Sequence, residues 1–298
     1  MTTTKEAIAH EFRLIQDEIC KGLEQLDGSG KFVEDAWQRD GGGGGRSRVL
    51  MHGALIEKGG VNFSEVHGEL PAHMKKEFGE ENTTFYATGV SIVLHPENPW
   101  VPIIHMNIRY FEMSNGTCWF GGGIDLTPHY VRPDQAERFH LHMKKVCDAF
   151  RPDAYTQFSQ WADEYFFIRH RNETRGIGGI FFDHQKPAND QERKSLFDFV
   201  CSVGRTFVPA YSEQVQLNRH LPYGETEKQW QLLRRGRYVE FNLVYDRGTR
   251  FGLETNGRIE SILMSLPETA SWLYNHQPAQ GSKEAETLKL LQPGQKRL

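Results

Sequence analysis

Between residues 89 and 130, polar side chains recur at every second position where a core strand would carry apolar ones. In segment 101–112, His105, Asn107 and Arg109 alternate with apolar residues. Successive side chains of a strand point to opposite faces, so these three polar groups share one face. An imidazole, an amide and a permanent cation in one row suit an anionic, hydrogen-bonding ligand.

The flanking segments repeat the alternation. Ser91 and His95 share one face of segment 89–95, and Asp125 shares a face with glycines in segment 119–127. Glycines inside a strand often mark a bulge or a place where a ligand approaches the backbone closely. The alternative is a sheet with one solvated face, which also gives polar alternation. Solvated faces favour Lys, Glu and Thr, whereas this face offers His, Asn, Arg, Trp, Gly and Asp, so the pattern favours a binding surface.

The remaining pattern predicts mainly helices. Apolar residues from Ile8 to Leu26 step by three or four, which indicates an amphipathic helix with a capping box at Thr3 and Glu6 and a stop at Gly28. Further helices are predicted over 134–150, 153–169 and 190–216, the last with a break at Pro209, and from Pro267 onward. Strands are predicted at 180–182 and 259–265, and a hairpin over 238–254.

Five consecutive glycines at 41–45 resemble a phosphate-binding loop. No Gly-Lys-Ser/Thr follows them and no helical pattern begins there, so a P-loop is rejected. A flexible loop and a lid over an active site are the two interpretations that remain.

Strands grouped in runs, with helices in separate blocks, indicate an α+β fold with an antiparallel sheet covered by helices. No regular strand–helix alternation and no GxGxxG after a strand is present, which argues against a dinucleotide-binding fold. No repeat or linker-like stretch divides the chain, so a single domain over residues 1–298 is predicted.

Composition narrows the function further. Hydrophobic residues form 38% and charged residues 25% of the 298, as in a globular protein. A net charge of -4 without a basic run argues against nucleic-acid binding, and means that an anionic ligand must be attracted by a local cluster of Arg and His. The four cysteines have no metal-binding spacing and fit a reducing cytosol. Without an apolar run of membrane-spanning length, integral membrane association is not expected, and a soluble cytoplasmic protein is predicted.

Several longer motifs resemble those of the oxygen-dependent coproporphyrinogen III oxidases. They are EDAWQR at 34–39, SRVL at 47–50, GVNFS at 60–64, FGGGIDLTP at 120–128, HRNETRGIGGIFFD at 170–183 and RRGRYVEFNLVYDRGT at 234–249. The resemblance runs in register over roughly residues 15–280.

The resemblance implies an activity and an architecture. Members convert coproporphyrinogen III to protoporphyrinogen IX, two propionates each losing carbon dioxide and two hydrogens to become vinyl groups. Molecular oxygen is the oxidant and no organic cofactor is used. The implied fold is a large flat antiparallel β-sheet flanked by α-helices on both faces, in a homodimer formed through residues 238–275.

The resemblance also assigns site residues. His105, Asp125 and Arg109 are the expected catalytic residues: His105 as proton donor, Asp125 as acceptor for pyrrole N–H groups, and Arg109 as a bidentate grip on a propionate. Histidine ordinarily titrates near neutrality, so an imidazole suits proton transfer in either direction. The expected substrate-binding residues are Ser91, Asn107, Ile108, Arg109, Asn256, Gly257 and Arg258. Asn256 replaces a glycine common in the family, and His184 replaces a common second aspartate after Asp183.

The resemblance also raises the expectation of a divalent metal. His95, His105, His142 and His170 match positions described as metal ligands in bacterial members, and imidazoles suit Zn, Mn, Fe or Cu. Their spacing carries no metal motif. His142 is predicted on the inner stripe of its helix, where a core histidine is the alternative, and His140 should face away from it.

Other interpretations stay open from sequence alone. His105 could hold a neighbouring strand, Asp125 could cap a turn, and Arg258 could be solvent-exposed. The chain could also be a non-catalytic tetrapyrrole carrier or a His-ligated metal oxygenase. Convergence of His105, Arg109, Asp125 and Arg258 on one cleft would favour the decarboxylating enzyme.

Overall fold

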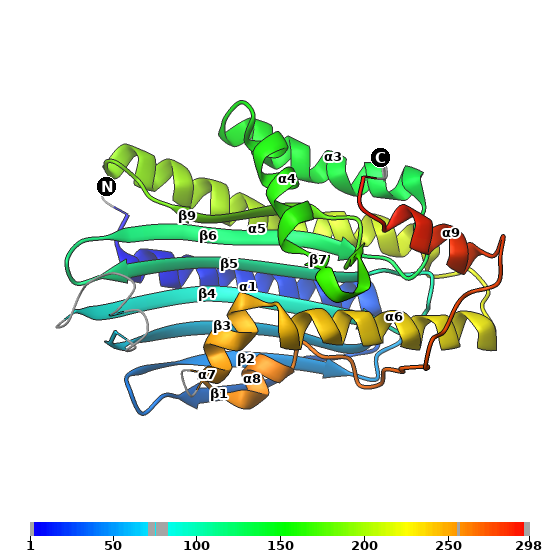
Figure 1. Cartoon of the computed structure of the whole chain (residues 1–298). Helices are drawn as coiled ribbons and strands as arrows, with labels where there is room; N and C mark the ends of the chain where they lie inside the picture. Colours follow the sequence, from blue (N-terminus) through cyan, green and yellow to red (C-terminus); the bar gives the residue numbers. More distant parts are fainter. Residues whose placement is uncertain (1–2, 71–74, 76–82, 255–256, 295–298) are drawn as a thin grey trace.

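The computed structural model describes residues 3–70, 75, 83–254 and 257–294. A seven-stranded sheet in the order β1-β2-β3-β4-β5-β6-β9 runs through it (Figure 1), and every pairing is antiparallel. Its strands are β1 Val33–Gln38, β2 Gly43–Met51, β3 Ile56–Glu69, β4 Thr84–Pro96, β5 Ile103–Met113, β6 Cys118–Thr127 and β9 Gly179–Gln185. A separate two-stranded pair joins β7 Phe167–Ile168 to β8 Glu173–Thr174. The predicted α+β class with an antiparallel sheet is confirmed.

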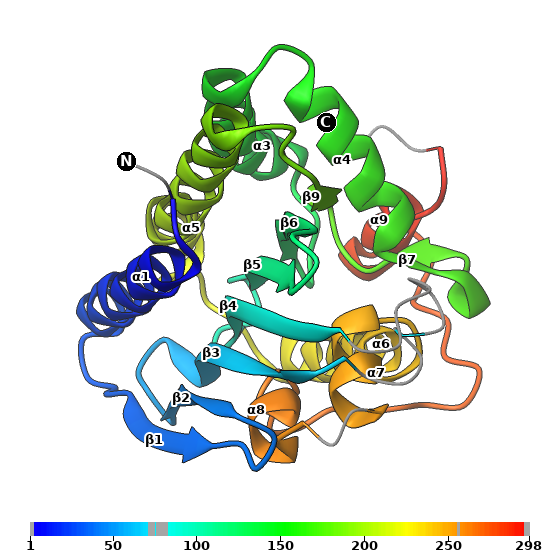
Figure 2. The same ribbon diagram turned by 90° about the vertical axis from the view of Figure 1, so that its left-hand side faces the viewer.

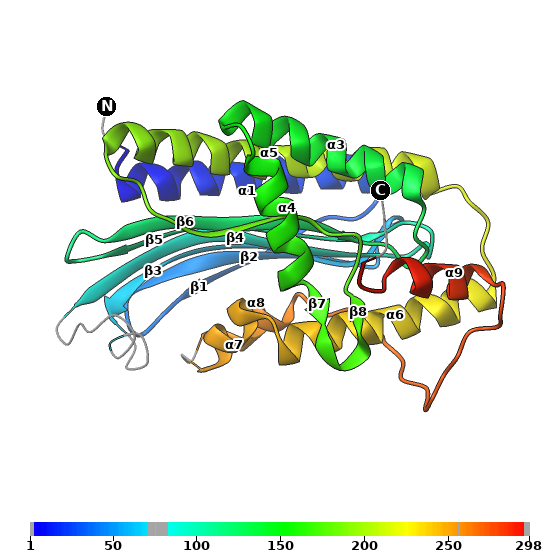
Figure 3. The same cartoon turned by 45° about the horizontal axis from the view of Figure 1, so that its top comes forward.

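Helices cover both faces of the sheet, as predicted (Figure 3). One face carries α1 Lys5–Asp27, α3 Pro133–Phe150 and α5 Asp190–Asn218. The other carries α6 Glu225–Val244, α7 Arg247–Glu254 and α8 Ile259–Leu263, while α4 Ala154–Tyr165 packs against β9 and α9 Lys283–Leu290 lies near the C-terminus. None of these helices is long and apolar enough to cross a membrane, over the part of the chain that the structure describes.

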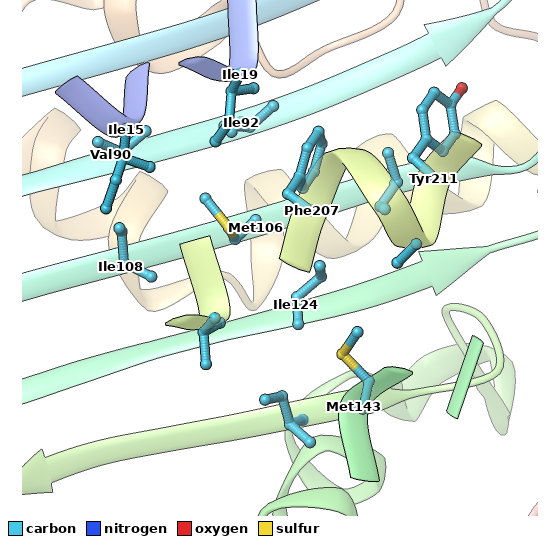
Figure 4. Close-up of a cluster of buried hydrophobic side chains, with 14 of the residues drawn as sticks. Ile15, Ile19, Val90, Ile92, Met106, Ile108, Ile124, Met143, Phe207 and Tyr211 are labelled. Carbon is cyan, nitrogen blue, oxygen red and sulfur yellow. The ribbon is translucent and has the colours of Figure 1, made fainter. Parts of the chain in front are cut away.

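The main hydrophobic core lies between the sheet and α1, α3 and α5 (Figure 4). Alternate residues of the central strands, such as Ile92, Met106 and Ile124, point into it and meet Ile15 of α1 and Phe207 of α5. The strand period of two therefore assigns one face of the sheet to stability and frees the other for different chemistry.

The first helix forms as predicted, with a small shift at its start. Its N-cap is Thr4, whose hydroxyl accepts the Ala7 N–H, and not Thr3. Gly28 ends the helix with φ of 90°, a left-handed conformation that glycine adopts without steric strain.

The glycine run spans the turn of a β-hairpin and the first residues of its second strand. Gly41 and Gly42 lie in the turn, where the Gly42 N–H donates to the Arg39 carbonyl. Residues 43–45 begin strand β2, which pairs with β1 in a hairpin. A side chain at Gly45 would collide with the Trp37 ring and the Phe63 carbonyl, because an ideal Cβ there would lie 2.2 Å and 2.5 Å from them. The glycines at 43–45 thus serve close packing within a strand, and the predicted loop is confined to Gly41 and Gly42.

The last quarter of the chain departs most from the prediction. The expected hairpin over 238–254 is the end of α6 followed by α7, and the expected strand over 259–265 contains α8. The buried positions of α6 include Arg234 and Arg235, which pair with Glu173 and Glu57. Because these buried positions are charged, the apolar residues of α6 do not show the spacing of three or four that predicts a helix. The β-branched and aromatic residues nearby favour a strand prediction instead. The helix predicted from Pro267 is also absent there, since the next helix, α9, begins at Lys283.

Pro209 does not break α5. The helix continues to Asn218 with this proline inside it. Proline removes one backbone hydrogen bond, which leaves the carbonyl of Arg205 without its helical donor. Both residues lie on the exposed side of the helix, where water can satisfy that carbonyl.

Asp27 ties the end of α1 to the turn between β2 and β3. Its buried carboxylate accepts hydrogen bonds from the backbone N–H groups of Ser29, Gly30, Ala54, Leu55 and Ile56. Burial alone would raise its pKa, but these donors outweigh it and lower the pKa to about 2.

We expect Asp27→Ala to lower the free energy of unfolding by about 3 kcal/mol or more, because it leaves buried N–H donors without an acceptor. Urea unfolding at pH 7 measures the loss, with Asp148→Ala in an exposed ion pair as the matched control. Since the folded pKa lies below the ordinary 3.8, the wild-type advantage of about 2 kcal/mol from this charge should be complete above pH 4 and fade as the pH falls toward 2. Equal losses in Asp27→Ala and Asp148→Ala would contradict this account.

Candidate functional site

The second face of the sheet carries a polar floor. Figure 2 looks along the strands and shows α1 and α5 on one side of them and α6 to α8 on the other. On the side of α6 to α8, Ser47, Asn62, Ser91, Asn107 and Gly123 lie directly opposite one another across five strands. The strand parity derived from the sequence thus becomes a transverse row of hydroxyl and amide groups.

A second row beside it consists almost entirely of small residues. Gly45, Ser64, Gly89, Arg109 and Gly121 are in register across β2 to β6. Arg109 is the one long side chain in this row, so its guanidinium has room to lie across the floor. Its Nη1 donates to Asn107 Oδ1 at 2.9 Å, and its Nη2 lies 2.8 Å from Asp183 Oδ2.

A third row holds the acid–base group. His105 on β5 lies opposite Asp125 on β6, and His105 Nδ1 is 2.7 Å from Asp125 Oδ1. The Arg175 Nη2 donates to both oxygens of Asp125, at 2.7 and 2.8 Å. With Asp125 ionised, His105 Nδ1 donates to it, which leaves Nε2 as the ring nitrogen for proton exchange.

Arg175 is held by α6, which lies on the same side of the sheet as the floor, and by aromatic rings. Its Nη1 donates to Asn242 Oδ1 at 3.0 Å, and its guanidinium lies 4.3 to 4.8 Å from the ring centres of Phe166, Tyr238 and Phe241. Cation–π contacts and the carboxylate together replace the water that a buried guanidinium loses.

The electrostatics of this cluster fix Asp125 as a carboxylate. Burial would raise its pKa, but the charge of Arg175 and the hydrogen bond from His105 prevail and lower it. Only 1% of the Asp125 side chain and 2% of Arg175 is exposed, compared with 18% of His105. His105 is therefore the member of the cluster that faces the floor.

This geometry changes the expected role of Asp125. Both of its oxygens are occupied by Arg175 and His105, and its side chain is covered. It does not offer a carboxylate to pyrrole N–H groups at the surface of the floor. Asp125 instead acts on His105. It orients the imidazole ring and stabilises its protonated form.

The other expected binding residues fall into two groups. Ser91 and Asn107 lie on the floor, whereas the Ile108 side chain is fully buried in the opposite core, so Ile108 offers a ligand its backbone at most. Asn256 lies outside the described residues. Gly257 donates its N–H to the Gly252 carbonyl, at the end of α7.

Arg258 stands on the far side of the floor. It pairs with Asp35 of β1 and lies 3.4 Å from the Ser261 hydroxyl, with 27% of its side chain exposed. Strands β1 and β5 are separated by four strand spacings, roughly 19 Å. Arg258 and Arg109 therefore mark opposite edges of one floor and do not grip the same group.

The four histidines expected to bind a metal do not form one ligand set. His95 is fully buried, its Nε2 lies 2.9 Å from the Ser265 carbonyl, and burial together with Arg235 lowers its pKa well below the usual value. His142 pairs with Glu213 on the opposite side of the sheet, and His170 pairs with Glu240. Within the described ranges, no three His, Cys, Asp or Glu side chains are placed to hold a metal ion.

The prediction for the two histidines of α3 is reversed. His140 is the buried one, and its two ring nitrogens lie 2.8 Å from the Tyr155 hydroxyl and 3.0 Å from the Ile177 carbonyl. His142 is 31% exposed. The polar partners in α4 and in the segment before β9 satisfy His140 inside the core, which the stripe of apolar residues could not reveal.

Sequence reasoning did not assign Arg175, Asp183 or Asn242 to the site. All three lie within the motifs at 170–183 and 234–249. A polar residue in a long motif was the available signal, but the partner of each residue comes from a distant segment.

Comparison with known proteins identifies the family. A family model described as coproporphyrinogen III oxidase matches residues 7–296. The chain belongs to the coproporphyrinogen III oxidase family. It is 49% identical over 295 residues to a protein of Parasynechococcus marenigrum (strain WH8102) named oxygen-dependent coproporphyrinogen-III oxidase, covering 91% of this chain and 81% of that protein. A protein of the same name from Prochlorococcus marinus (strain NATL1A) is 48% identical, over 91% of this chain and 84% of the relative.

We expect Arg175→Met to lower the free energy of unfolding by about 3–5 kcal/mol, because it leaves the buried Asp125 carboxylate without its cation. Adding Asp125→Asn to that variant should recover part of the loss. Denaturant unfolding of the two single variants and the double variant measures the coupling, with Lys194→Met in an exposed ion pair as the control. Strictly additive losses would show that the two residues are not energetically paired.

Proposed function

We propose that this chain catalyses the oxygen-dependent conversion of coproporphyrinogen III to protoporphyrinogen IX, in porphyrin and haem biosynthesis. The observation that carries the proposal is the His105–Asp125 pair beside Arg109 on one polar floor, in a chain that belongs to this family. A proton-transfer group and an anchor for carboxylates are what the reaction needs from the protein.

The reaction sets the demand on the site. Each reacting propionate loses its carboxylate as carbon dioxide and a hydride equivalent from the neighbouring carbon, and the side chain becomes a vinyl group. The two electrons and that hydrogen, together with one proton, reduce molecular oxygen to hydrogen peroxide. The protein must therefore hold a polyanionic, non-aromatic macrocycle in place and exchange protons beside the carbon that reacts.

His105 is the residue that moves the proton. Asp125 holds its Nδ1 at 2.7 Å, so the imidazole has a fixed orientation and its Nε2 is the exchanging atom. A buried carboxylate behind the ring stabilises the imidazolium that forms when His105 accepts a proton. Arg175 keeps that carboxylate ionised, and hence ready, without contacting the substrate itself.

Arg109 holds a propionate. It has two positively charged N–H edges in a plane, a geometry that matches a carboxylate. With 34% of its side chain exposed, it is accessible from the floor. The row of glycines and serines around it gives a macrocycle a surface without bulky side chains.

Molecular oxygen is the proposed oxidant, as the word oxygen-dependent in the names of the relatives supports, and no organic cofactor is proposed. The four expected metal ligands do not fit a common metal, since their partners lie in separate parts of the fold. No step of the proposed reaction is therefore assigned to a metal ion.

A cytoplasmic homodimer is the proposed working form. The region expected to form the interface exposes several large apolar side chains, namely Leu243, Val244, Trp272, Leu273 and Tyr274. Covering them in a dimer would remove apolar surface from water. All four cysteines are free thiols, which suits a reducing compartment.

The activity is tested by incubating the chelator-treated protein with coproporphyrinogen III in air and under anaerobic conditions. We expect a divinyl product in air alone. His105→Ala should lower kcat at least 100-fold, because the acid–base group is lost, whereas His10→Ala on the exposed side of α1 should match the wild type.

Three outcomes would count against the proposal. Binding without turnover in air would support a tetrapyrrole carrier. Activity lost on metal removal and restored by one metal would support the metal oxygenase. Full activity of His105→Ala would remove His105 from the chemistry.

We expect the protein at micromolar concentration to sediment as a dimer. A stable interface buries about 1,000 Å² or more, and the apolar side chains exposed within 238–275 would lie at its centre. Replacing Leu273 by Asp should shift the sedimentation toward the monomer, while Leu141→Asp, on α3, should not. A wild-type monomer, or equal behaviour of both variants, would contradict this interface.

A further inference from the structure

Asp183 is placed on the floor by an irregularity in the sheet. The register between β6 and β9 shifts between Phe120 and Gly122, and His184 has a φ of 47°, in the left-handed region. Such bulges redirect side chains and are frequent beside active sites. Here the bulge aims Asp183 at Arg109, whose Nη2 lies 2.8 Å from Asp183 Oδ2.

The Asp183 carboxylate is itself fixed. Its second oxygen, Oδ1, accepts the backbone N–H of His184 at 2.8 Å, and the His184 ring stacks on Trp119 with 5.0 Å between ring centres. With 11% of its side chain exposed, Asp183 is largely covered, while Arg109 above it remains one-third exposed.

Gly121 makes this arrangement possible. It lies opposite Arg109 on β6, and an ideal Cβ there would come within 2.6 Å of Asp183 Oδ1 and 2.8 Å of Arg109 Nε. The two side chains therefore meet in the space that a larger residue would fill. Three segments, β5, β6 and the bulge, converge on the orientation of one guanidinium.

We propose that Asp183 is the positioning residue for Arg109, and thereby sets the affinity for the substrate carboxylate that Arg109 binds. This inference rests on the proposed function. Asp183 and Asn107 each take one terminal nitrogen of the guanidinium, which clamps its plane against the floor. A guanidinium has five N–H donors, so donors remain for a carboxylate arriving from the open side.

The mechanism is orientation and not attraction. The negative charge of Asp183 offsets that of Arg109, so it does not increase the pull on an anion. It removes alternative rotamers of a long flexible side chain, and pre-organisation of this kind strengthens binding by cutting the entropy lost when the ligand arrives.

The test is a double-mutant cycle on Asp183 and Arg109 in the full-length protein. Asp183→Ala should raise KM for coproporphyrinogen III about tenfold, corresponding to ~1.4 kcal/mol, with kcat changed by less than threefold. In an Arg109→Ala background, the same substitution should change KM by less than twofold. Asp183→Asn retains an acceptor oxygen and should recover at least half of the affinity on a logarithmic scale.

A second variant probes the pair without deleting either charge. Gly121→Ala should weaken binding like Asp183→Ala, because its methyl group displaces both side chains, while Asp198→Ala in an exposed ion pair is the control. Melting temperatures within about 3 °C of the wild type exclude general unfolding. Unchanged KM in Asp183→Ala, an equal loss in the Arg109→Ala background, or no recovery by Asp183→Asn would each overturn the inference.

Binding of coproporphyrin III, the stable oxidised tetracarboxylate, gives a readout that does not need turnover. The same tenfold weakening in Asp183→Ala, abolished in the Arg109→Ala background, is expected in fluorescence titrations. A wild type that binds this probe with the expected cycle but shows no turnover would reject the proposed activity and keep the inference. An active wild type in which Asp183 and Arg109 show no coupling would keep the proposed activity and reject the inference.

Discussion

The buried ion pair between Asp125 and Arg175 is the constraint on which the site depends. Two charges out of water are costly unless they are paired. Here Arg175 Nη2 donates to both oxygens of Asp125, Nη1 donates to Asn242, and three aromatic rings lie against the guanidinium. The pair links β6, the segment before β9 and α6, which lie more than 40 residues apart in sequence. The pair also fixes the orientation of His105, which is the one partly exposed residue of the cluster formed by His105, Asp125 and Arg175.

Alternate residues of each strand point to opposite faces of the sheet, so one face packs against the core helices and the other carries the candidate site. One set of alternate residues fills the core against α1, α3 and α5. The middle part of the other set forms the polar floor, between two small apolar clusters that include Phe111 and Ile103. A strand holds its side chains in a rigid, regular array, which suits a site that must keep a proton-transfer group and an anchor at a constant separation. His105 and Asn107, the residue to which Arg109 bends back, are two positions apart, about 7 Å along the strand. This separation suits a ligand that carries carboxylates on several rings, so that one is held while another lies beside the imidazole.

The sequence revealed the floor but not what supports it. Alternation within β4, β5 and β6 placed His105, Asn107, Arg109 and Asp125 on one face, because a strand has a local period that needs no tertiary information. The partners of these residues, Arg175 and Asp183, come from distant segments, so no local pattern links them. The C-terminal helices were misassigned for a related reason. In α6, buried Arg234 and Arg235 are polar by sequence and become core residues only through Glu173 and Glu57.

Two carboxylates on the neighbouring strands β6 and β9 each hold a basic residue of the floor. Asp125 is buried and its pKa is lowered, so it is ionised, and it contacts His105 and not the open face of the floor. Asp183 is bound to the backbone of its own bulge and acts on Arg109 through geometry. In both cases an acidic residue conditions a basic one that faces the ligand, so the exposed groups of the floor remain those that an anion seeks. A polyanion that approached this face would meet imidazole, amide and guanidinium groups, while the carboxylates that hold them are largely covered. By this division a chain with a net charge of -4 presents basic and neutral polar groups on one face of its sheet, as the proposed polyanionic substrate requires.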